Sequence, residues 1–417
     1  MAETQALNSG DMAWLLTSTG LVLLMTPGLA LFYGGMVRTR NLVSTMFQSF
    51  VCMSLISLVW VFVGFSLAFG PSLGGIIGNP FTHFALNDVG LTANPIYAAT
   101  IPFMLFALFQ MKFAVITPAL VTGAFSERIR FKAYLFFSVF FCLFVYAPIA
   151  HWTWNPDGFL RKMGVLDFAG GTVVHISAGI AALTAALMMR RRTDIEHQPS
   201  NIPYVLLGTG MLWFGWFGFN AGSALAANGQ AVQAFLTTNT ASAAGMLTWI
   251  IIDWIKKGRP SAMGACIGAV VGLVAITPAA GYVGVGASTF IGLLASTVSY
   301  YVVQWRTRTS IDDTLDVFPC HGVGGIVGML ATAVFAEGGA GLIDGNTQTI
   351  KAHLVALVIV VGYTALMSYV GFSIIRWFSP LVVSPEEELA GLDLVQLGET
   401  AGESFPIDRL TPRDLPL

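Results

Sequence analysis

Two histidines lie inside long apolar stretches of the sequence. His175 is in the run GGTVVHISAG, residues 170–179, and His321 is in the run DVFPCHGVGG, residues 316–325. Ionisable side chains inside membrane-spanning segments are costly and mark functional sites by default. A neutral imidazole donates a hydrogen bond from one nitrogen and accepts one at the other. A facing pair would share one proton and line a narrow path; two separate packing histidines are the alternative.

Aromatic residues form a second group. Phe109 and Phe113 are four residues apart, on one face of a helix, and Trp154 follows an apolar stretch. The run WFGWFGFNAGS, residues 213–223, ends at Ser223. Aromatic faces hold a small cation with about 0.5–2 kcal/mol per ring, and a hydroxyl can complete such a site. Alternatively, these rings are packing residues and interfacial anchors.

Other reactive residue types do not form a recognisable catalytic or metal site. HExxH is absent, and two histidines without nearby carboxylates make a poor zinc site. Ser223 has no base that the sequence places beside it. We therefore predict no enzymatic activity, no cofactor and no metal. The remaining histidines read as solvated or interfacial residues, and the cysteines as small buried hydrophobes: His83, His151, His197 and His353; Cys52, Cys142, Cys266 and Cys320.

The elements that position these residues are membrane-spanning helices. Of 417 residues, 55% are hydrophobic and 10% are charged, whereas soluble domains carry roughly 25% charged residues. A helix needs about 20 apolar residues to cross the hydrocarbon core. This predicts an all-α polytopic membrane protein with eleven spans, near 12–36, 42–70, 97–125, 131–152, 168–190, 202–226, 232–256, 261–278, 283–304, 316–336 and 350–378.

Basic residues predict the orientation. The loops after the odd-numbered spans hold fourteen lysines and arginines, and the opposite loops hold only Arg161, Lys162 and Lys351. Basic loops stay in the cytoplasm. We therefore expect residues 1–11 to form an outer tail, residues 12–378 the membrane domain, and residues 379–417 an acidic cytoplasmic tail.

An odd number of spans has a consequence for symmetry. If spans one to five resemble spans six to ten, the units are inverted, and an eleventh helix follows them. Asp167 opens span five, eight residues before His175, and Asp316 opens span ten, five residues before His321. At 1.5 Å per residue, both histidines arrive near the bilayer midplane. Inverted repeats place substrate paths at their interface.

These motifs together resemble the ammonium transporter (Amt/Rh/methylammonium permease) family over nearly the whole chain. Further matching stretches are PGLALFYGG at 27–35, GAFSER at 123–128 and GLD at 391–393. Trp154 is typical of the Amt branch rather than the Rh branch. The resemblance implies a homotrimer with one pore per subunit, in the cell inner (plasma) membrane. It also implies that the cytoplasmic tail couples subunits and meets a PII-type signal protein.

The resemblance also implies residue roles. Trp154, Phe113 and Ser223, with Phe109 beside them, would form the outer ammonium site. Phe113 and Phe219 would stack as a gate, and His175 and His321 would be the central pair. Asp167 would hold the outer vestibule together and favour the cation indirectly.

Two departures from the family pattern bear on function. Lys112 stands beside Phe113, where the family usually has a small or uncharged residue. The chain also continues from Gly402 to Leu417 as an extended segment, which is either an ordinary tail or the start of a linker. A lysine inside a span is expensive unless paired, neutral or snorkelling. If it lay near the pore, it would repel ammonium; otherwise it is a structural lysine.

The sequence therefore predicts transmembrane ammonium transport. NH4+ is recruited at the aromatic site and deprotonated, because moving a bare ion into low dielectric costs on the order of 20 kcal/mol, and NH3 passes the histidines. The alternative is an ammonium-binding sensor with little conduction that signals through its tail. A carbon dioxide channel is disfavoured by Trp154, and the net charge of −2 says nothing about nucleic-acid partners.

Overall fold

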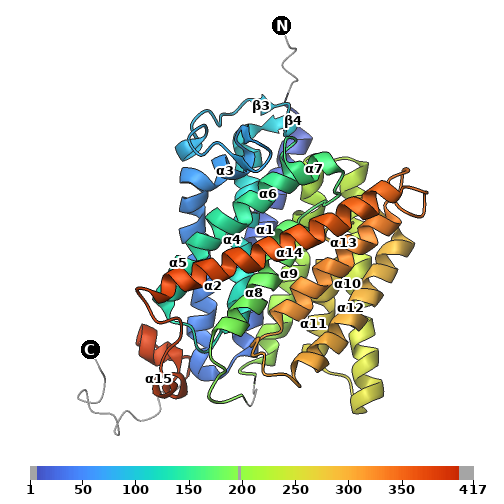
Figure 1. Ribbon diagram of the computed structural model, residues 1–417. Coiled ribbons are helices and arrows are strands. Elements are labelled where there is room, and N and C mark those ends of the chain that lie inside the picture. Colours follow the sequence, from blue (N-terminus) through green and yellow to red (C-terminus); the bar gives the residue numbers. More distant parts are fainter. Residues whose placement is uncertain (1–6, 196–198, 403–417) are drawn as a thin grey trace.

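The computed structural model of the chain describes residues 7–195 and 199–402, and these residues are mainly helical. The helices pack side by side around a common core, and the short strands lie together at one end of the molecule (Figure 1). The long elements are α1 (Ser9–Met36), α2 (Leu42–Val59), α4 (Phe103–Phe125), α5 (Phe131–Phe141), α6 (Ala147–Trp154), α8 (Ser177–Met188), α9 (Ile202–Ala221), α10 (Gly229–Lys257), α11 (Ala262–Ile276), α12 (Val285–Arg306), α13 (Gly324–Phe335) and α14 (Thr347–Arg376).

Shorter elements join or extend these helices. They are the helical turns η1 (Thr39–Asn41), η3 (Phe84–Leu86), η6 (Gly222–Ala224), α3 (Phe65–Phe69), α7 (Phe159–Met163) and α15 (Pro385–Ala390), the π-helical turns η2 (Trp60–Gly64), η4 (Cys142–Tyr146), η5 (Gly171–Ile176), η7 (Phe318–Val323) and η8 (Asp393–Leu397), and the strands β1 (Ser72–Leu73), β2 (Ile77–Gly78), β3 (Ala93–Asn94) and β4 (Ala98–Pro102). The strands form two antiparallel pairs, β1 with β2 and β3 with β4.

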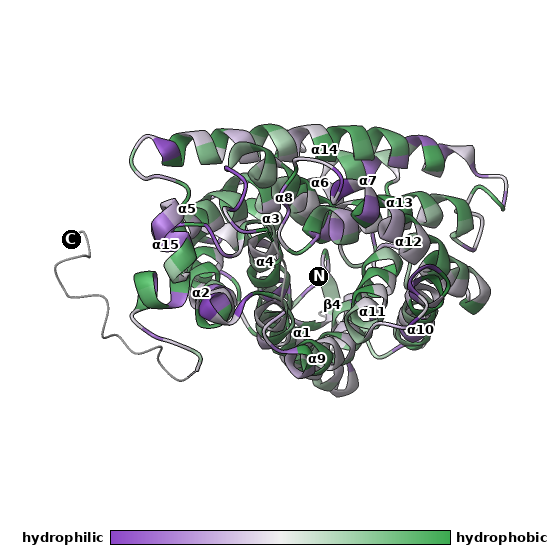
Figure 2. Cartoon of the chain, turned by 90° about the horizontal axis from the view of Figure 1, so that it is seen from below, coloured by the Kyte–Doolittle hydropathy of each residue, from purple (hydrophilic) through white to green (hydrophobic). Residues whose placement is uncertain are grey.

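Ten helical segments of the described chain are long and apolar enough to cross a membrane, and the apolar helix Ala262–Ile276 is shorter. Each of these helical segments overlaps one of the eleven predicted segments, although several extend beyond the predicted bounds. Hydrophobic residues make up much of these helices in the end-on view (Figure 2). The polytopic membrane fold is thereby confirmed, while the eleven crossings and their direction stay predictions.

The third predicted segment begins too early. Residues 98–102 form β4, and α4 starts only at Phe103. Pro102 explains the difference, because a proline disfavours helical geometry at the residue before it, here Ile101. Pro102 instead precedes the first helical turn with an extended ψ of 139°.

The two halves of the chain repeat one local structure. Residues 171–188 form a six-residue π-helical turn followed by twelve α-helical residues, and residues 318–335 do the same. In each case a carboxylate caps the first turn. Asp167 does so in the first half, and Asp313, not Asp316, does so in the second. The expected counterpart, Asp316, instead pairs with Arg306 at 2.6 Å.

With this correction the spacing becomes equal: Asp313 lies eight residues before His321, as Asp167 lies eight before His175. The local structure thus supports the predicted inverted repeat.

Helix α14 lies obliquely over both halves. Its 30 residues are about 45 Å long, more than the roughly 30 Å of a hydrocarbon core, so it must tilt. Figure 1 shows it running diagonally across α8 and α13. Phe372 on α14 stacks on Phe137 of α5, with ring centroids 4.1 Å apart.

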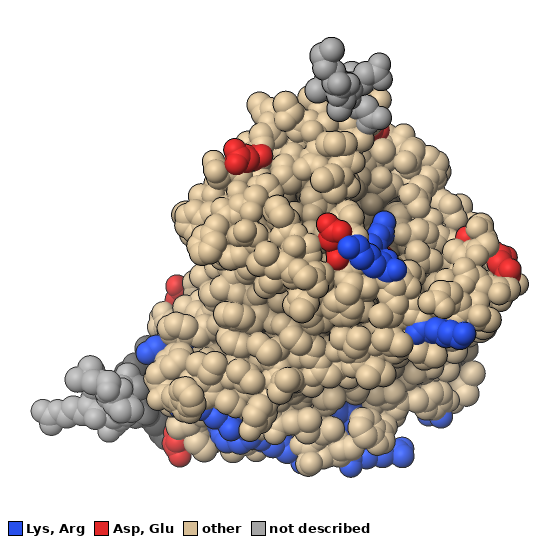
Figure 3. Space-filling view, turned by 45° about the horizontal axis from the view of Figure 1, so that its top comes forward, with Lys and Arg blue, Asp and Glu red and all other residues tan. Residues whose placement is uncertain are grey.

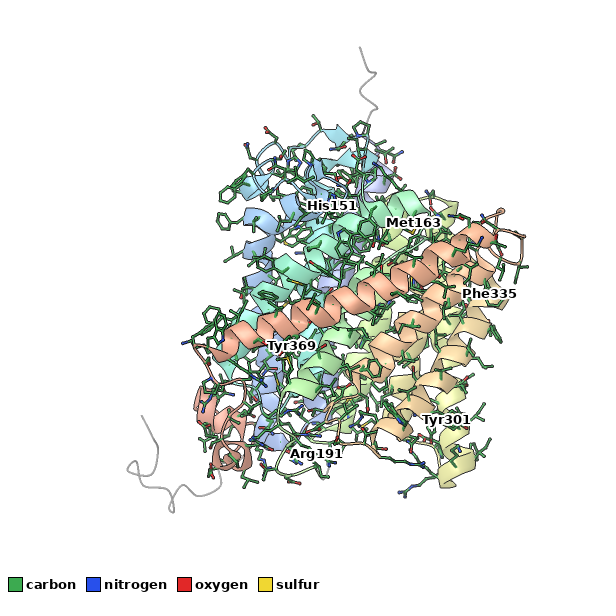
Figure 4. The ribbon with its side chains drawn as sticks, in the orientation of Figure 1. His151, Met163, Arg191, Tyr301, Phe335 and Tyr369 are labelled. Atoms are coloured by element: carbon green, nitrogen blue, oxygen red, sulfur yellow. The ribbon has the colours of Figure 1, made fainter. Side chains whose placement is uncertain are left out.

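Lysines and arginines gather at one end of the helix bundle, where carboxylates pair with several of them. We call the end that holds residues 126–132, 190–195, 306–316 and 379–402 the basic face, and the opposite end, with the strands and α7, the vestibule face. Figure 4 shows Arg191 at the first end and Met163 toward the second.

A buried ionic network ties the basic face together. The guanidinium groups of Arg128 and Arg192 bind Asp312, and Arg192 also binds Glu127, at N–O distances of 2.6–3.2 Å. Burial raises the pKa of Asp312, but the two arginines outweigh it and bring the pKa down to about 2. Breaking one partner of such a buried pair is strongly destabilising.

The segment that follows α14 is anchored to this face. The Asp393 carboxylate accepts hydrogen bonds from the backbone N–H groups of Val43 and Ser44, at 2.9 and 2.7 Å, in the first turn of α2. Arg130 pairs with Glu387 at 2.8 Å. The predicted extension, residues 403–417, lies outside the described residues.

Two of the four histidines outside the central pair are more buried than expected. His151 and His353 are fully buried rather than solvated. His353 bonds the backbone oxygen of Met329 through Nδ1 and accepts a hydrogen bond from the backbone N–H of Leu166 through Nε2. Amphipathic imidazoles satisfy buried backbone groups in this way. His83 is half-buried, and His197 lies outside the described residues. The cysteines are buried free thiols, as predicted.

Candidate functional site

His175 and His321 meet in the middle of the bundle. Their Nδ1 atoms are 3.3 Å apart and their ring centroids 5.4 Å apart, and both side chains are almost completely buried. The structure therefore brings together the two histidines that the sequence singled out, each on the first helical turn of its repeat.

Hydrogen bonding around Thr277 assigns the ring tautomers. The Thr277 hydroxyl donates to the Leu273 carbonyl at 2.8 Å and accepts from Trp216 Nε1 at 2.9 Å. Because its single proton is used, its contact of 3.3 Å with His175 Nε2 requires that this nitrogen donate. His175 Nδ1 is then the acceptor, and His321 Nδ1–H the donor, in the bond between the rings. His321 Nε2 is then an acceptor, and no residue in 7–195 or 199–402 donates to it.

Each histidine helix begins on a buried carboxylate. Asp167 accepts hydrogen bonds from the backbone N–H groups of Gly170, Gly171 and Thr172 and from the Thr172 hydroxyl, at 2.5–2.8 Å. An anion at a helix N-terminus satisfies unpaired donors and opposes the helix dipole. The expected structural role of Asp167 thus has a geometric basis.

Glycines let the two histidine helices cross at contact distance. A Cβ atom placed on Gly179 would lie 2.1 Å from the backbone nitrogen of Gly322, far inside van der Waals contact. Any side chain at Gly179 would push the helices apart, and with them the two imidazoles.

Two phenylalanine rings pack against each other next to the histidines. The ring centroids of Phe113 and Phe219 are 4.2 Å apart, with 32° between the ring planes. Phe219 also faces His175, at 6.0 Å between centroids. The two rings expected to form a gate are therefore in contact, and one of them is next to the central pair.

An open cavity of about 210 Å³ lies on the other side of these rings, on the vestibule face. We call it the vestibule. Its lining includes Trp154, Phe113, Ser223 and Asp167. Trp154 meets Phe113 edge to face at 6.0 Å, and its Nε1 donates to the Asp167 carbonyl at 3.0 Å. The structure thus gathers these four predicted site residues around one space.

Phe109 is the exception in this group. It is fully buried, is not part of the vestibule lining, and packs against Phe113 with centroids 5.0 Å apart. It therefore supports the gate ring from behind instead of facing the cavity.

Gln110 was missed by the sequence reasoning. It lines the vestibule, and its buried Oε1 has no hydrogen-bond partner in the described part of the chain. An unpaired buried acceptor is costly, and a small rotation of the Gln110 side chain would offer this oxygen to a donor in the cavity. A polar amide three residues before Phe113 was the signal for it.

Lys112 does not line the vestibule. Its Nζ lies 3.7 Å from Met111 Sδ, and no carboxylate within residues 7–195 and 199–402 pairs with it. The side chain is half-buried. The structure does not bring Lys112 together with the other predicted site residues.

Beyond the gate, narrow space continues past the histidines. A cavity of about 10 Å³ is lined by Phe219, Trp216, His175 and His321, and a second of similar size, lined by His321 and Tyr33, follows it. Apart from the histidines and the Tyr33 and Trp216 polar atoms, apolar side chains dominate both linings. Contacting or shared residues connect these spaces in order: Phe113 lines the vestibule and touches Phe219, Phe219 lines the first small cavity, and His321 lines both small cavities.

Comparison with known proteins agrees with this arrangement. Residues 13–402 match the model of the Ammonium Transporter Family. The chain is 47% identical, over 95% of its length and 98% of the relative, to a putative ammonium transporter of Methanothermobacter thermautotrophicus. It is similar to the crystal structure of Saccharomyces cerevisiae Mep2, with a TM-score of 0.86, 32% identity and coverage of 92% and 89% of the two chains. It is equally similar in fold to a structure described as a sensor Amt protein, with a TM-score of 0.86, 30% identity and coverage of 93% and 98%.

Proposed function

Because the chain belongs to the ammonium transporter family, we propose that it carries ammonium nitrogen through its own pore, as NH4+ to the gate and as NH3 beyond it. The observation that carries this proposal is the facing pair His175 and His321, set behind a closed aromatic gate in an apolar passage.

Recruitment takes place in the vestibule. The faces of Trp154 and Phe113 attract a small cation, by about 0.5–2 kcal/mol per ring. The Ser223 hydroxyl and the unpaired Gln110 Oε1 accept hydrogen bonds from its N–H groups. The Ser223 hydroxyl proton is bound to the Phe219 carbonyl at 2.8 Å, which leaves its lone pairs toward the ligand.

Deprotonation follows from the energetics of the passage. A bare ion entering low dielectric costs on the order of 20 kcal/mol in the Born limit, far more than two rings and two acceptors return. Neutral NH3 has no such penalty, so NH4+ gives its proton to water in the open vestibule before NH3 enters the passage. The Phe113 and Phe219 rings must part for it, and beyond them His321 Nε2 offers the acceptor that one of its N–H groups needs.

Ammonium-dependent current or uptake in proteoliposomes tests the proposal. A parent protein that gives ammonium-dependent flux well above that of empty liposomes supports it. Parent protein that binds ammonium but gives flux equal to that of empty liposomes would overturn it in favour of the second function below.

An ammonium sensor is the second candidate. The similarity to a sensor Amt protein favours it, as does the close contact of the gate rings. In that case ammonium would bind in the vestibule and change the contacts of the segment anchored by Asp393, without much flux.

The assembly and location are also proposals. We propose a homotrimer in the cell inner (plasma) membrane, with one pore per subunit and no covalent chemistry on the substrate. The anchored segment, residues 379–402, lies on the basic face, where a PII-type signal protein would reach it.

A further inference from the structure

The vestibule contains a fixed positive charge. Arg161, on α7, is solvent-exposed and lines the vestibule with Trp154, Gln230 and Tyr282. Figure 3 shows basic side chains beside a hollow on the vestibule face. The sequence had treated Arg161 only as one of the few basic residues of the outer loops.

The charge of Arg161 has no ion-pair partner within the described ranges. Its neighbour Lys162 pairs with Asp157 at 2.8 Å, but Arg161 forms no ion pair with a residue in 7–195 or 199–402. Among the described residues that line the vestibule, two are charged, Arg161 and Asp167.

The carboxylate at Asp167 does not cancel this charge at the mouth. It is 3% exposed, and four donors hold it at the start of η5. Burial raises the pKa of Tyr282, and the neighbouring Arg161 guanidinium lowers it. Arg161 therefore places its charge at the cavity wall beside Tyr282.

We propose that Arg161 weakens the capture of ammonium by charge repulsion, and thereby sets the concentration range in which the pore fills. This inference rests on the proposed function, since it concerns the same outer site. It gives the protein an unusual salt dependence: screening by salt reduces the repulsion, so ammonium binding strengthens as ionic strength rises.

The size of the effect follows from Coulomb's law. Two unit charges about 10 Å apart, at an effective dielectric between those of water and a protein surface, change an equilibrium constant by about two- to tenfold. The Debye length falls from about 30 Å at 0.01 M to about 8 Å at 0.15 M, so most of that factor is lost over this range.

The test compares Arg161→Gln, which removes the charge, with Arg161→Lys, which retains it. Lys162→Gln is the matched control, because Lys162 is on the same short helix but is paired with Asp157 and does not line the vestibule. Ammonium binding by calorimetry and uptake into vesicles of neutral lipid are measured at ionic strengths from about 0.01 to 0.15 M, adjusted with a large organic cation.

We expect Arg161→Gln to bind ammonium about two- to tenfold more tightly than the parent at low ionic strength and to lose the salt dependence. Arg161→Lys and Lys162→Gln should behave as the parent. Equal affinities and equal salt dependence for parent and Arg161→Gln overturn the inference. The inference is also overturned if Arg161→Lys differs from the parent in affinity or salt dependence. A positioning role of the guanidinium would then explain the effect of Arg161→Gln.

Failure of the inference is distinguishable from failure of the proposed function. If the parent takes up ammonium and Arg161→Gln is unchanged, only the inference is wrong. If the parent binds ammonium without flux, transport is wrong, yet the affinities still decide the role of Arg161.

Discussion

His175 Nδ1 and His321 Nδ1 face each other at 3.3 Å although 146 residues separate them in the chain. Equal spacing brings them there: each histidine stands eight residues after a carboxylate that caps its helix. The crossing at Gly179 and Gly322 then sets the distance between the rings. The central pair is thus a product of the repeat and is positioned by backbone contacts.

The histidine pair should matter for proton handling. His175→Ala removes the acceptor for His321 Nδ1–H and the donor to Thr277, so we expect slower ammonium flux or weaker discrimination against potassium. Current and potassium competition in proteoliposomes measure both. His83→Ala, at a half-buried loop histidine, is the control. If flux and discrimination both match the parent, the pair is a packing feature.

Trp154 should contribute to ammonium affinity. Trp154→Leu removes one ring face, and the loss should be about 0.5–2 kcal/mol, or roughly two- to thirtyfold in the dissociation constant. Calorimetry on intact oligomers measures it. Trp254→Leu, at a tryptophan that is 61% exposed on α10, should leave the affinity unchanged. An unaltered affinity in Trp154→Leu removes this ring from the site.

Lys112 provides a test of the idea that a charge within α4 limits flux. The Lys112 side chain touches Met111 and does not line the vestibule. It could therefore affect the cation only by long-range electrostatic repulsion or by shifting α4. If Lys112 limits flux, Lys112→Thr raises the ammonium-dependent current. If it is a structural lysine, the substitution changes thermal stability and leaves the current as it was, at matched amounts of folded protein. The geometry favours this second outcome.

Orientation is tested by labelling single cysteines. The background lacks the four natural cysteines, which are all buried. Arg259→Cys, next to the left-handed Gly258 at the end of α10, should react with an impermeant reagent only from the cytoplasm. Gly229→Cys, at the start of α10, should react only from outside. Reversed accessibility at either position contradicts the basic-loop rule for this chain.

Much of the fold was predictable because each span is a local property. A run of about twenty apolar residues predicts a membrane helix whatever the neighbouring helices are. Both central histidines were found because they are polar residues inside such runs. Phe113, Trp154, Ser223 and Asp167 were expected together because the motif resemblance joined them, and the structure gathers them around the vestibule.

The features that the sequence did not predict depend on which way a side chain faces and on where loop residues lie in the fold. Phe109 shares a helix face with Phe113, but whether it faces a cavity depends on the neighbouring helices, and it packs behind the gate. Asp313 was passed over for Asp316 because the helix boundary was misplaced by a few residues. Arg161 belongs to a loop helix, whose position over the vestibule no periodicity reveals.

Helix α14 has a consequence for biogenesis. It is the last of the long helices to leave the ribosome, and it crosses both repeats, with His353 holding the Leu166 backbone just before Asp167 and Phe372 stacked on Phe137. The helices that α14 contacts must therefore lie side by side before these contacts form. A chain interrupted before α14 would lack both the brace across the repeats and the His353 bond beside the Asp167 cap. Such an incomplete bundle is the form that membrane quality control would recognise.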